Sequence, residues 1–245
     1  GQYEMTMRYQ EICRMADTGQ LFRSTLKEAA MGMGGRISFM AKPFDGVTGN
    51  SCHMHLSLTD AAGKNVFAAP EAPQHISDTC RHFIGGVLAH MPELTAIFFP
   101  NSNSYRRLVP GNFAPISLVW GVDNRTTAVR VLNETPEATR AELRVCGGDI
   151  QIHLAMAAYL AAGLDGIRKG TDPGAQSVGD LDEQDVTRIP DDWGKALDVF
   201  DASDWVKEAF GEEFCRNFSV LKRFEYDAYR RTVPETERKA YIEFL

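Results

Sequence analysis

The sequence predicts an α+β fold in which helices flank an antiparallel β-sheet. Three observations support this prediction: strand-like segments gather in the middle of the chain, helical apolar spacing dominates both flanks, and the composition is that of a globular domain. A chain of 245 residues that is 44% hydrophobic is long enough for one substantial core. No change of composition divides it, so residues 1–245 are predicted to be a single domain.

The N-terminal part is predicted to contain one helix and two strands. Apolar residues at helical spacing predict a helix from about residue 17 to residue 30, which a glycine cluster ends. Residues 37–42 are predicted to form a strand. Residues 52–58 alternate strictly between the two faces, which is typical of a strand and places His53 and His55 on the same face.

The middle of the chain is predicted to contain a hairpin, a helix, a loop and three strands. Residues 62–64 turn the chain, and Ser77 has the residue type expected of a helix N-cap. Residues 101–115 are predicted to be a loop because Pro and Gly interrupt a polar stretch. The three predicted strands span residues 117–122, 127–132 and 141–146.

The C-terminal part is predicted to be largely helical. Residues 150–167 read as a helix rich in small residues, and residues 172–192 as a polar, acidic connection. The last predicted helices include an amphipathic segment. Its inward stripe is predicted to comprise Phe214, Phe218, Leu221 and Ala228.

Charge and composition exclude several classes of partner. The formal net charge is −7, which argues against a nucleic-acid-binding surface. No apolar stretch approaches the ~20 residues that cross a bilayer, so no membrane association is expected. The five cysteines are scattered and never in C-x-x-C spacing, which argues against a disulfide scaffold or structural zinc and favours the reducing cytoplasm.

The pair His53 and His55 is the first candidate for chemistry. Alternate residues of a strand project to one face, so both imidazoles can address one site, and neutral imidazole is a good partner for metal ions. The alternative is a pair of strand histidines that form ordinary hydrogen bonds. The other four histidines have no partner in sequence and are predicted to be structural or to lie on the surface; they are His75, His82, His90 and His153.

An arginine series is the second candidate. Residues 101–146 contain six arginines, no lysine and four carboxylates, so this segment carries +2 and the rest of the chain −9. Arginine grips carboxylate or phosphate oxygens bidentately with a charge that it cannot lose. The series comprises Arg106, Arg107, Arg125, Arg130, Arg140 and Arg144.

Glu142 stands between Arg140 and Arg144 at alternating positions, so the two guanidiniums are expected to keep it ionised, as a metal ligand must be. The alternative is a solvated salt-bridge ladder on an exposed strand. Together the residue types indicate metal and phosphate chemistry. The absence of a Walker A sequence and of a dinucleotide-binding glycine fingerprint argues against P-loop and Rossmann enzymes.

Several segments carry a resemblance to a known family. Residues 39–58 contain F-M-A-K-P followed by Gly49 and H-M-H-L-S-L, residues 103–111 read N-S-Y-R-R-L-V-P-G, and residues 124–144 contain N-R-T and R-A-E-L-R. With A-G-L-D-G-I at 162–167 and G-Q-Y-E at 1–4, they resemble, in family order, motifs of the glutamine synthetase superfamily. Because they span nearly the whole chain, it is identified as a member, most similar to γ-glutamylpolyamine and other γ-glutamylamine synthetases.

The resemblance implies a set of metal-binding and nucleotide-binding residues. Two or more divalent cations, Mg²⁺ or Mn²⁺, are expected in each site. Glu4 would bind the cation that organises glutamate, and His53 and Glu142 would bind the cation on the nucleotide phosphates. Residues implied to contact ATP are Tyr9, His55, Ser57, Arg125 and Arg140.

The resemblance also implies how glutamate and the transferred phosphate are held. Gly49 and Arg107 would hold the α-groups of glutamate, and Arg144 would grip a carboxylate. Arg125 and Arg130, with Arg140, would neutralise phosphate oxygens. The implied reaction is ATP-dependent phosphorylation of the γ-carboxylate of glutamate, followed by displacement of the phosphate by an amine.

One position departs from the ammonia-using members of the family. Their segment after V-P-G reads x-E-A-P, whereas this chain has Phe113 in place of the glutamate. Phenylalanine offers an apolar wall or a ring face for an alkylammonium, but no proton acceptor. Residues 120–125 also resemble the W-G-x-D-N-R pattern of relatives that use organic amines. We therefore expect a bulkier amine than ammonia, such as a polyamine.

Other functions stay open at this point. One is an ammonia-using glutamine synthetase in which another residue supplies the base. Another is a non-catalytic, structural relative of the same fold, against which the retained metal, phosphate and glutamate positions argue. A guanidino kinase of related catalytic fold lacks support because the motifs are of the ligase type.

The resemblance implies the family's catalytic domain, a curved antiparallel sheet flanked by helices, in N-terminally incomplete form. The N-terminal β-grasp domain and two upstream metal-binding glutamates of the family are not in this chain. A homo-oligomer, a double-ring dodecamer in the full-length family, is expected. The segment alone is expected to have no synthetase turnover.

Overall fold

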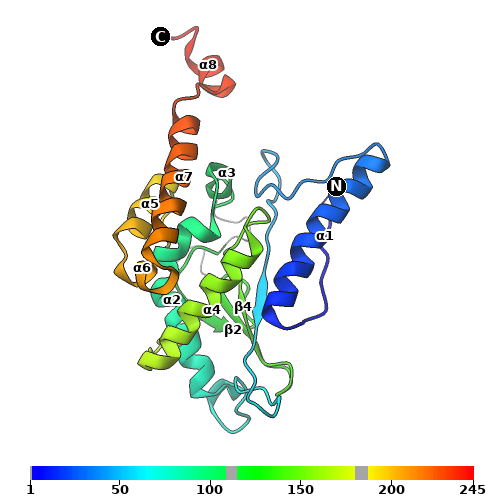
Figure 1. The fold of residues 1–245 in the computed structure, drawn as a ribbon, viewed down its shortest axis with the longest axis vertical. Coiled ribbons are helices and arrows are strands. Elements are labelled where there is room, and N and C mark those ends of the chain that lie inside the picture. Colours follow the sequence, from blue (N-terminus) through cyan, green and yellow to red (C-terminus); the bar gives the residue numbers. More distant parts are fainter. Residues whose placement is uncertain (1, 109–114, 180–186) are drawn as a thin grey trace.

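Four short strands form one sheet in the order β1-β4-β3-β2 in the computed structural model, which describes residues 2–108, 115–179 and 187–245 (Figure 1). The central strand β4 pairs antiparallel with β1 and with β3, whereas β2 pairs parallel with β3. The α+β class and the mainly antiparallel sheet are thus confirmed. The strands are β1 (Met54–Leu56), β2 (Trp120–Val122), β3 (Val129–Leu132) and β4 (Arg140–Leu143).

The predicted strands are shortened or absent in the structure. Residues 37–42 are irregular, so the strand predicted there is wrong. A strand needs a neighbouring strand to pair with, and the local sequence pattern cannot provide one. The segment is held at its end by a side chain, because the amide of Lys42 donates to Oδ1 of Asn103 at 2.8 Å. The predicted strand 52–58 contains only β1, although Cys52 still donates its amide to the carbonyl of Cys146 at 3.0 Å.

Two long helices, α2 (Asp78–Phe98) and α4 (Ile152–Lys169), pack against each other and cover the sheet (Figure 1). Ser77 caps α2 as predicted, because its side chain accepts from the amide of Cys80. The helices approach closely at Gly86 and Gly166: a Cβ on Gly86 would lie 2.2 Å from a carbonyl oxygen of α4. Tyr159 ties α4 to β4 through a 3.0 Å hydrogen bond from its hydroxyl to the carbonyl of Ala141.

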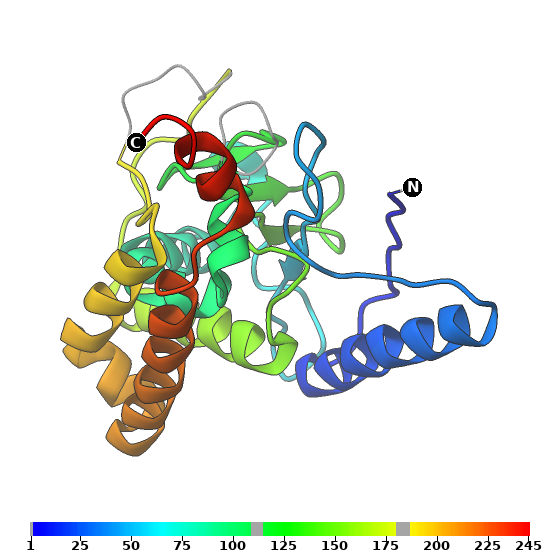
Figure 2. The ribbon, with the colours of Figure 1, turned by 90° about the horizontal axis from the view of Figure 1, so that it is seen from above.

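Helix α1 (Ile12–Gly32) projects from the body beside the extended N-terminal segment (Figure 2). It begins about five residues earlier than predicted. The carboxylate of Glu11 accepts from the amides of Cys13 and Arg14, and this capping extends the helix toward the N-terminus. Two further short helices are η1 (Pro73–His75) and α3 (Ser102–Tyr105), the latter within the segment predicted to be a loop.

The C-terminal residues form four helices, and the last of them leads away from the body (Figure 1). Phe214 and Phe218 face inward as predicted, but Leu221 is 53% exposed and Ala228 is exposed as well. The packed face turns instead toward Tyr226, whose ring lies 5.7 Å from that of Trp193. The helices are α5 (Trp193–Ala202), α6 (Asp204–Phe210), α7 (Glu212–Arg230) and α8 (Glu235–Tyr241).

A helix that crosses a bilayer is long and almost wholly apolar. Within the described ranges, no helix combines the length and the apolar character that a bilayer crossing requires.

Candidate active site

Glu142 lies at the centre of a charged cluster on the sheet. Because β4 is a central strand, Glu142 has His55 of β1 and Arg130 of β3 as its direct cross-strand neighbours. Its carboxylate receives Nη1 of Arg144 at 2.7 Å on Oε1 and Nη1 of Arg130 at 3.2 Å on Oε2. Only 2% of Glu142 is exposed, and Arg144 is also buried. The alternative of an exposed salt-bridge ladder is therefore wrong for this pair.

The surroundings of Glu142 keep its carboxylate charged. Burial on its own would raise the pKa of Glu142. The hydrogen bond from His53 and the charge of Arg144 outweigh burial and lower this pKa to about 2. The site thus holds a permanent anion at neutral pH, among guanidiniums that cannot lose their charge.

Both histidines of the predicted pair face this anion, so the sequence-based expectation that they address one site is confirmed. Nδ1 of His53 lies 3.2 Å from Oε1 of Glu142, and Nε2 of His55 lies 3.8 Å from the same oxygen. Nδ1 of His55 in turn accepts from Nε of Arg140 at 3.3 Å. Burial lowers the pKa of His55, which favours the neutral imidazole.

The donor set around His53 fits a divalent cation. A carboxylate beside Nδ1 favours the tautomer with its proton there, which leaves a lone pair on Nε2. That Nε2 is buried and has no hydrogen-bond partner in the described part of the chain. An imidazole oriented by a carboxylate, with its other nitrogen free, is the usual arrangement of a metal-binding histidine. However, the described residues contain no group of three or more His, Cys, Asp or Glu side chains placed to hold a metal ion together, so further ligands must complete such a site.

The structure does not join Glu4 and Tyr9 to this cluster. Both are exposed in the N-terminal segment, Tyr9 by 90%. The start of that segment is held near the site, because Nε2 of Gln2 donates to the carbonyl of Gly49 and to Oδ1 of Asn50, each at 2.9 Å. The roles implied for Glu4 and Tyr9 remain predictions.

The remaining candidates for nucleotide or phosphate binding lie around the edge of the cluster. Arg140 donates from Nη1 to the carbonyl of Ala138 at 2.7 Å and lies beside His55. Arg125 is exposed, and its carbonyl accepts from Nε of Arg144 at 3.1 Å. Ser57 is exposed just after β1. The structure therefore groups the guanidiniums of Arg130, Arg140 and Arg144 around one carboxylate and one histidine pair, with Arg125 adjoining.

Arg107 lies behind Gly49 and is 1% exposed. Its Nη2 donates to the carbonyl of Val145, whereas Nε and Nη1 have no partner in the described ranges. Burial lowers the pKa of Arg107 to about 10. In this conformation its guanidinium faces the interior, so the direct contact with glutamate that the resemblance implies remains a prediction. Phe113 lies outside the described residues.

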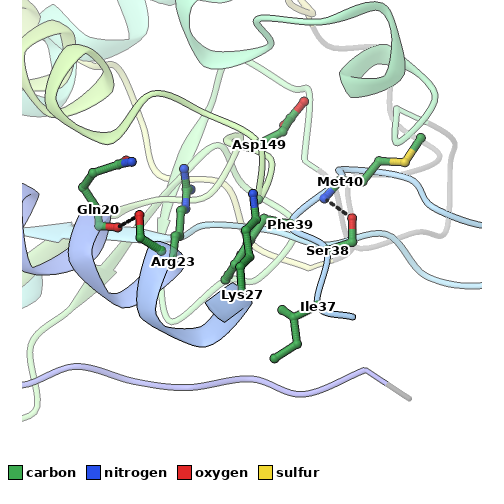
Figure 3. Close-up of a pocket in the computed structure, with 10 residues that line it drawn as sticks. Gln20, Arg23, Lys27, Ile37, Ser38, Phe39, Met40 and Asp149 are labelled. Atoms are coloured by element: carbon green, nitrogen blue, oxygen red, sulfur yellow. Dashed lines mark hydrogen bonds between the residues drawn. The ribbon is translucent and has the colours of Figure 1, made fainter. Parts of the chain in front are cut away.

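A separate cavity of about 360 Å³ lies between α1, residues 37–40 and Asp149 (Figure 3). Arg23 and Lys27 of α1 border it, each near the ring of Phe39, at 5.5 and 5.8 Å from its centroid. None of the predicted site residues lines this cavity. The candidate active site is therefore the charged cluster on the sheet.

The comparisons with known proteins agree with this geometry. The family model "Glutamine synthetase, catalytic domain" matches residues 1–241 of the chain. The chain belongs to the glutamine synthetase family. Members of this family are ligases. The cluster around Glu142 has the charges and side-chain types that suit metal and phosphate chemistry.

Curated relatives of this glutamine synthetase-family chain include proteins named glutamine synthetase and one named gamma-glutamylethanolamide synthetase. A protein named glutamine synthetase from Halobacterium salinarum is 36% identical over 251 residues, covering 99% of the chain and 55% of the relative. Gamma-glutamylethanolamide synthetase GlnA4 of Streptomyces coelicolor is 36% identical over 243 residues, covering 99% and 52%. The chain thus spans about half the length of the curated relatives that it matches.

Solved structures confirm the family fold. The structure titled "GmaS/ADP complex-Conformation 1" superposes with a TM-score of 0.88 at 34% identity, covering 96% of the chain and 56% of that protein. "Apo GmaS without ligand" superposes with a TM-score of 0.83 at 35% identity, covering 93% and 53%. The predicted catalytic-domain fold is therefore correct.

The charge state of Glu142 predicts a pH-dependent stability. Its pKa is about 2 in the folded protein and about 4.5 when unfolded, so folding favours the charged form. The stabilisation is fully present above pH 4.5 and is lost as the pH falls toward 2. We expect the difference in unfolding free energy between the wild type and Glu142→Gln, from urea titrations, to shrink steadily as the pH falls from 4.5 to 3. A constant difference across that range would contradict the assigned pKa.

Proposed function

We propose that the protein is an ATP-dependent ligase that joins the γ-carboxylate of glutamate to an amine through a γ-glutamyl phosphate. The observation that carries this proposal is the buried, ionised Glu142, which is surrounded by two imidazoles and by the guanidiniums of Arg130 in β3 and of Arg144, just after β4. Such a cluster can hold a cation and stabilise the charge of a transferring phosphoryl group. Family membership supports the same chemistry.

The proposed roles of the residues follow from their placement. Nε2 of His53 would hold one Mg²⁺ or Mn²⁺ ion while Glu142 orients the imidazole through Nδ1, and Glu4 would contribute to a second. For Glu142 to bind the same ion as His53, as the resemblance implies, the ion would have to replace the contact between Nδ1 and Oε1. When bound, such ions polarise phosphate oxygens and offset their negative charge. Arg130 and Arg140 would neutralise phosphate oxygens from the two sides of the cluster, and Arg144 keeps Glu142 ionised.

For the amine, we propose an organic amine or polyamine rather than ammonia. Phe113 supports this choice, because a ring replaces the glutamate that would attract ammonium. The relatives support both choices, since a glutamine synthetase and a gamma-glutamylethanolamide synthetase are equally identical to the chain. Glutamine formation from ammonia is therefore the second candidate function.

An amine panel tests the proposal. ADP release by the protein as its gene encodes it is measured with glutamate, ATP and Mg²⁺, adding ammonia, methylamine, ethanolamine or putrescine in turn. We expect release to require both glutamate and an amine, with at least one organic amine exceeding ammonia in kcat/KM. Equal or better use of ammonia would make the second candidate correct. The absence of glutamate-dependent ADP release would instead indicate a structural relative.

Phe113→Glu is predicted to shift the preference toward ammonia. The new carboxylate attracts a small cation and accepts its proton, while the apolar wall for the larger amine is lost. We expect the ratio of kcat/KM for the best organic amine to that for ammonia to fall by about 10-fold, which corresponds to roughly 1.4 kcal/mol. Phe44→Glu, at an exposed phenylalanine, is the control. An unchanged ratio in Phe113→Glu would contradict the specificity proposal.

Two further proposals concern the protein's assembly and surroundings. We propose a homo-oligomer, on the ground of the family resemblance, and size-exclusion chromatography with light scattering tests it. We also propose a cytoplasmic location, because the cysteines are odd in number and all are free thiols.

A further inference from the structure

Asp123 is held against Arg130 by both its side chain and its backbone. The residue lies between β2 and β3, and its Oδ1 accepts from Nε of Arg130 at 3.0 Å and also from Nη2. Its amide donates to the carbonyl of Val131 at 2.9 Å. These contacts fix the turn after β2 directly on the strand that carries Arg130.

The backbone of Asp123 has an unfavourable conformation for most residue types. Its φ is +47°, and in the described ranges only Gln74 and His75 share a positive φ among residues other than glycine. Asp and Asn adopt this conformation most readily of the non-glycine residues. The position therefore combines a constrained turn with a carboxylate that the turn aims at a guanidinium.

Arg130 is consequently shared between two carboxylates. Nε and Nη2 face Asp123, whereas Nη1 donates to Oε2 of Glu142 at 3.2 Å. The two carboxylates differ in environment, because the Asp123 side chain is 74% exposed and that of Glu142 is 3% exposed. The guanidinium of Arg130 therefore lies at the boundary between the buried cluster and solvent, with one carboxylate partner on each side.

Removal of Asp123 would free this guanidinium. With Glu142 as its one remaining carboxylate partner, the guanidinium of Arg130 can rotate to donate two hydrogen bonds to Glu142, or it can extend into solvent. Either movement takes positive charge from the place where it is fixed now. Preorganised charge stabilises a transition state because no reorganisation is needed during the reaction.

We propose that Asp123 is a positioning residue, which orients Arg130 toward the phosphate of the reaction. The inference rests on the proposed function, in which Arg130 neutralises phosphate oxygens. Asp123 itself contacts neither the substrate nor the transferred group. The pKa of Asp123 is lowered by its hydrogen bond to Arg130, which agrees with a permanently charged partner.

Two substitutions separate the carboxylate from the backbone conformation. Asp123→Asn keeps an acceptor oxygen and tolerates the positive φ, whereas Asp123→Gly tolerates the φ and removes the side chain. We expect kcat for amine-dependent ADP release to fall about 10- to 100-fold in Asp123→Gly, the range for hydrogen bonds to charged groups. Asp123→Asn should restore most of this loss. Asp198→Asn, which weakens an exposed pair with Arg223 far from the sheet, is the control.

A double-mutant cycle shows whether the effect passes through Arg130. In an Arg130→Lys background, a single ammonium cannot bridge the two carboxylates, so Asp123→Gly should lower kcat less than twofold further. An equal loss in both backgrounds, or no loss from Asp123→Gly alone, would overturn the inference.

A crystal structure of Asp123→Gly gives a readout that does not depend on activity. We expect the guanidinium of Arg130 to leave its present position, and an unmoved guanidinium would overturn the inference. A wild-type protein without glutamate-dependent ADP release would contradict the proposed function alone. The crystal structure would then still decide whether Asp123 positions Arg130.

Discussion

Glu142→Gln is expected to lower the amine-dependent release of ADP by about 1,000-fold, at the upper end of the effects of removing one preorganised electrostatic group. The substitution keeps the size of the side chain but removes the charge that Arg130, Arg144 and the two histidines surround. It also leaves two guanidiniums of the cluster without a buried anion. Steady-state kinetics with saturating glutamate and ATP measure the effect.

The same substitution should also destabilise the fold. Removing one partner of a buried ion pair costs about 3–5 kcal/mol, because the other charge stays buried without compensation. Glu137→Gln is the matched control, since Glu137 is an exposed carboxylate in the turn that precedes β4. Activity of Glu142→Gln within tenfold of the wild type would show that Glu142 is not central to the reaction.

Gly49→Ala is expected to disrupt the site through backbone geometry alone. A Cβ at this position would lie 2.4 Å from the carbonyl oxygen of Ala41 and 2.9 Å from Cγ of Arg107. The carbonyl belongs to the backbone and cannot rotate away, so the segment and Arg107 must shift. Overpacking of this kind costs about 1–3 kcal/mol. We expect a lower thermal midpoint and an increase of at least about 10-fold in KM for glutamate.

Gly32→Ala is the control for this experiment. A Cβ on Gly32 would meet no atom within 4 Å, and the residue lies at the end of α1, which projects from the body (Figure 2). An unchanged KM in Gly49→Ala would indicate that this backbone does not border the glutamate site. A raised KM in both variants would point to a general loss of stability.

The part of the site that the sequence predicted best rests on strand periodicity. Period-two alternation placed His53 and His55 on one face, and the R-A-E-L-R spacing placed Glu142 beside Arg144. Both statements need only local geometry, because side chains two residues apart on a strand point the same way. The structure adds that the histidine pair and the R-A-E-L-R segment lie side by side around Glu142, because β1 and β4 are paired with His55 opposite Glu142.

Features that depend on distant partners could not be predicted in this way. The strand expected over residues 37–42 needs a neighbouring strand, which no local pattern reveals. The burial of Arg107 follows from the packing of Gly49 above it, and a charged residue in a polar segment gives no sign of burial. The role of Asp123 depends on a positive φ and on its distance to Arg130. In the sequence, the position of Asp123 two residues before Arg125 is the sign that this carboxylate lies near the arginine series.

Anomalous diffraction from crystals of the protein, as its gene encodes it, soaked with Mn²⁺ and ADP shows directly whether the cluster around His53 and Glu142 holds a cation beside a nucleotide. A metal peak at coordination distance from Nε2 of His53, with the guanidinium of Arg130 facing the nucleotide phosphates, is the predicted result. A metal peak elsewhere, with His53 and Glu142 directed at unrelated surfaces, would contradict the ligase mechanism proposed for this site.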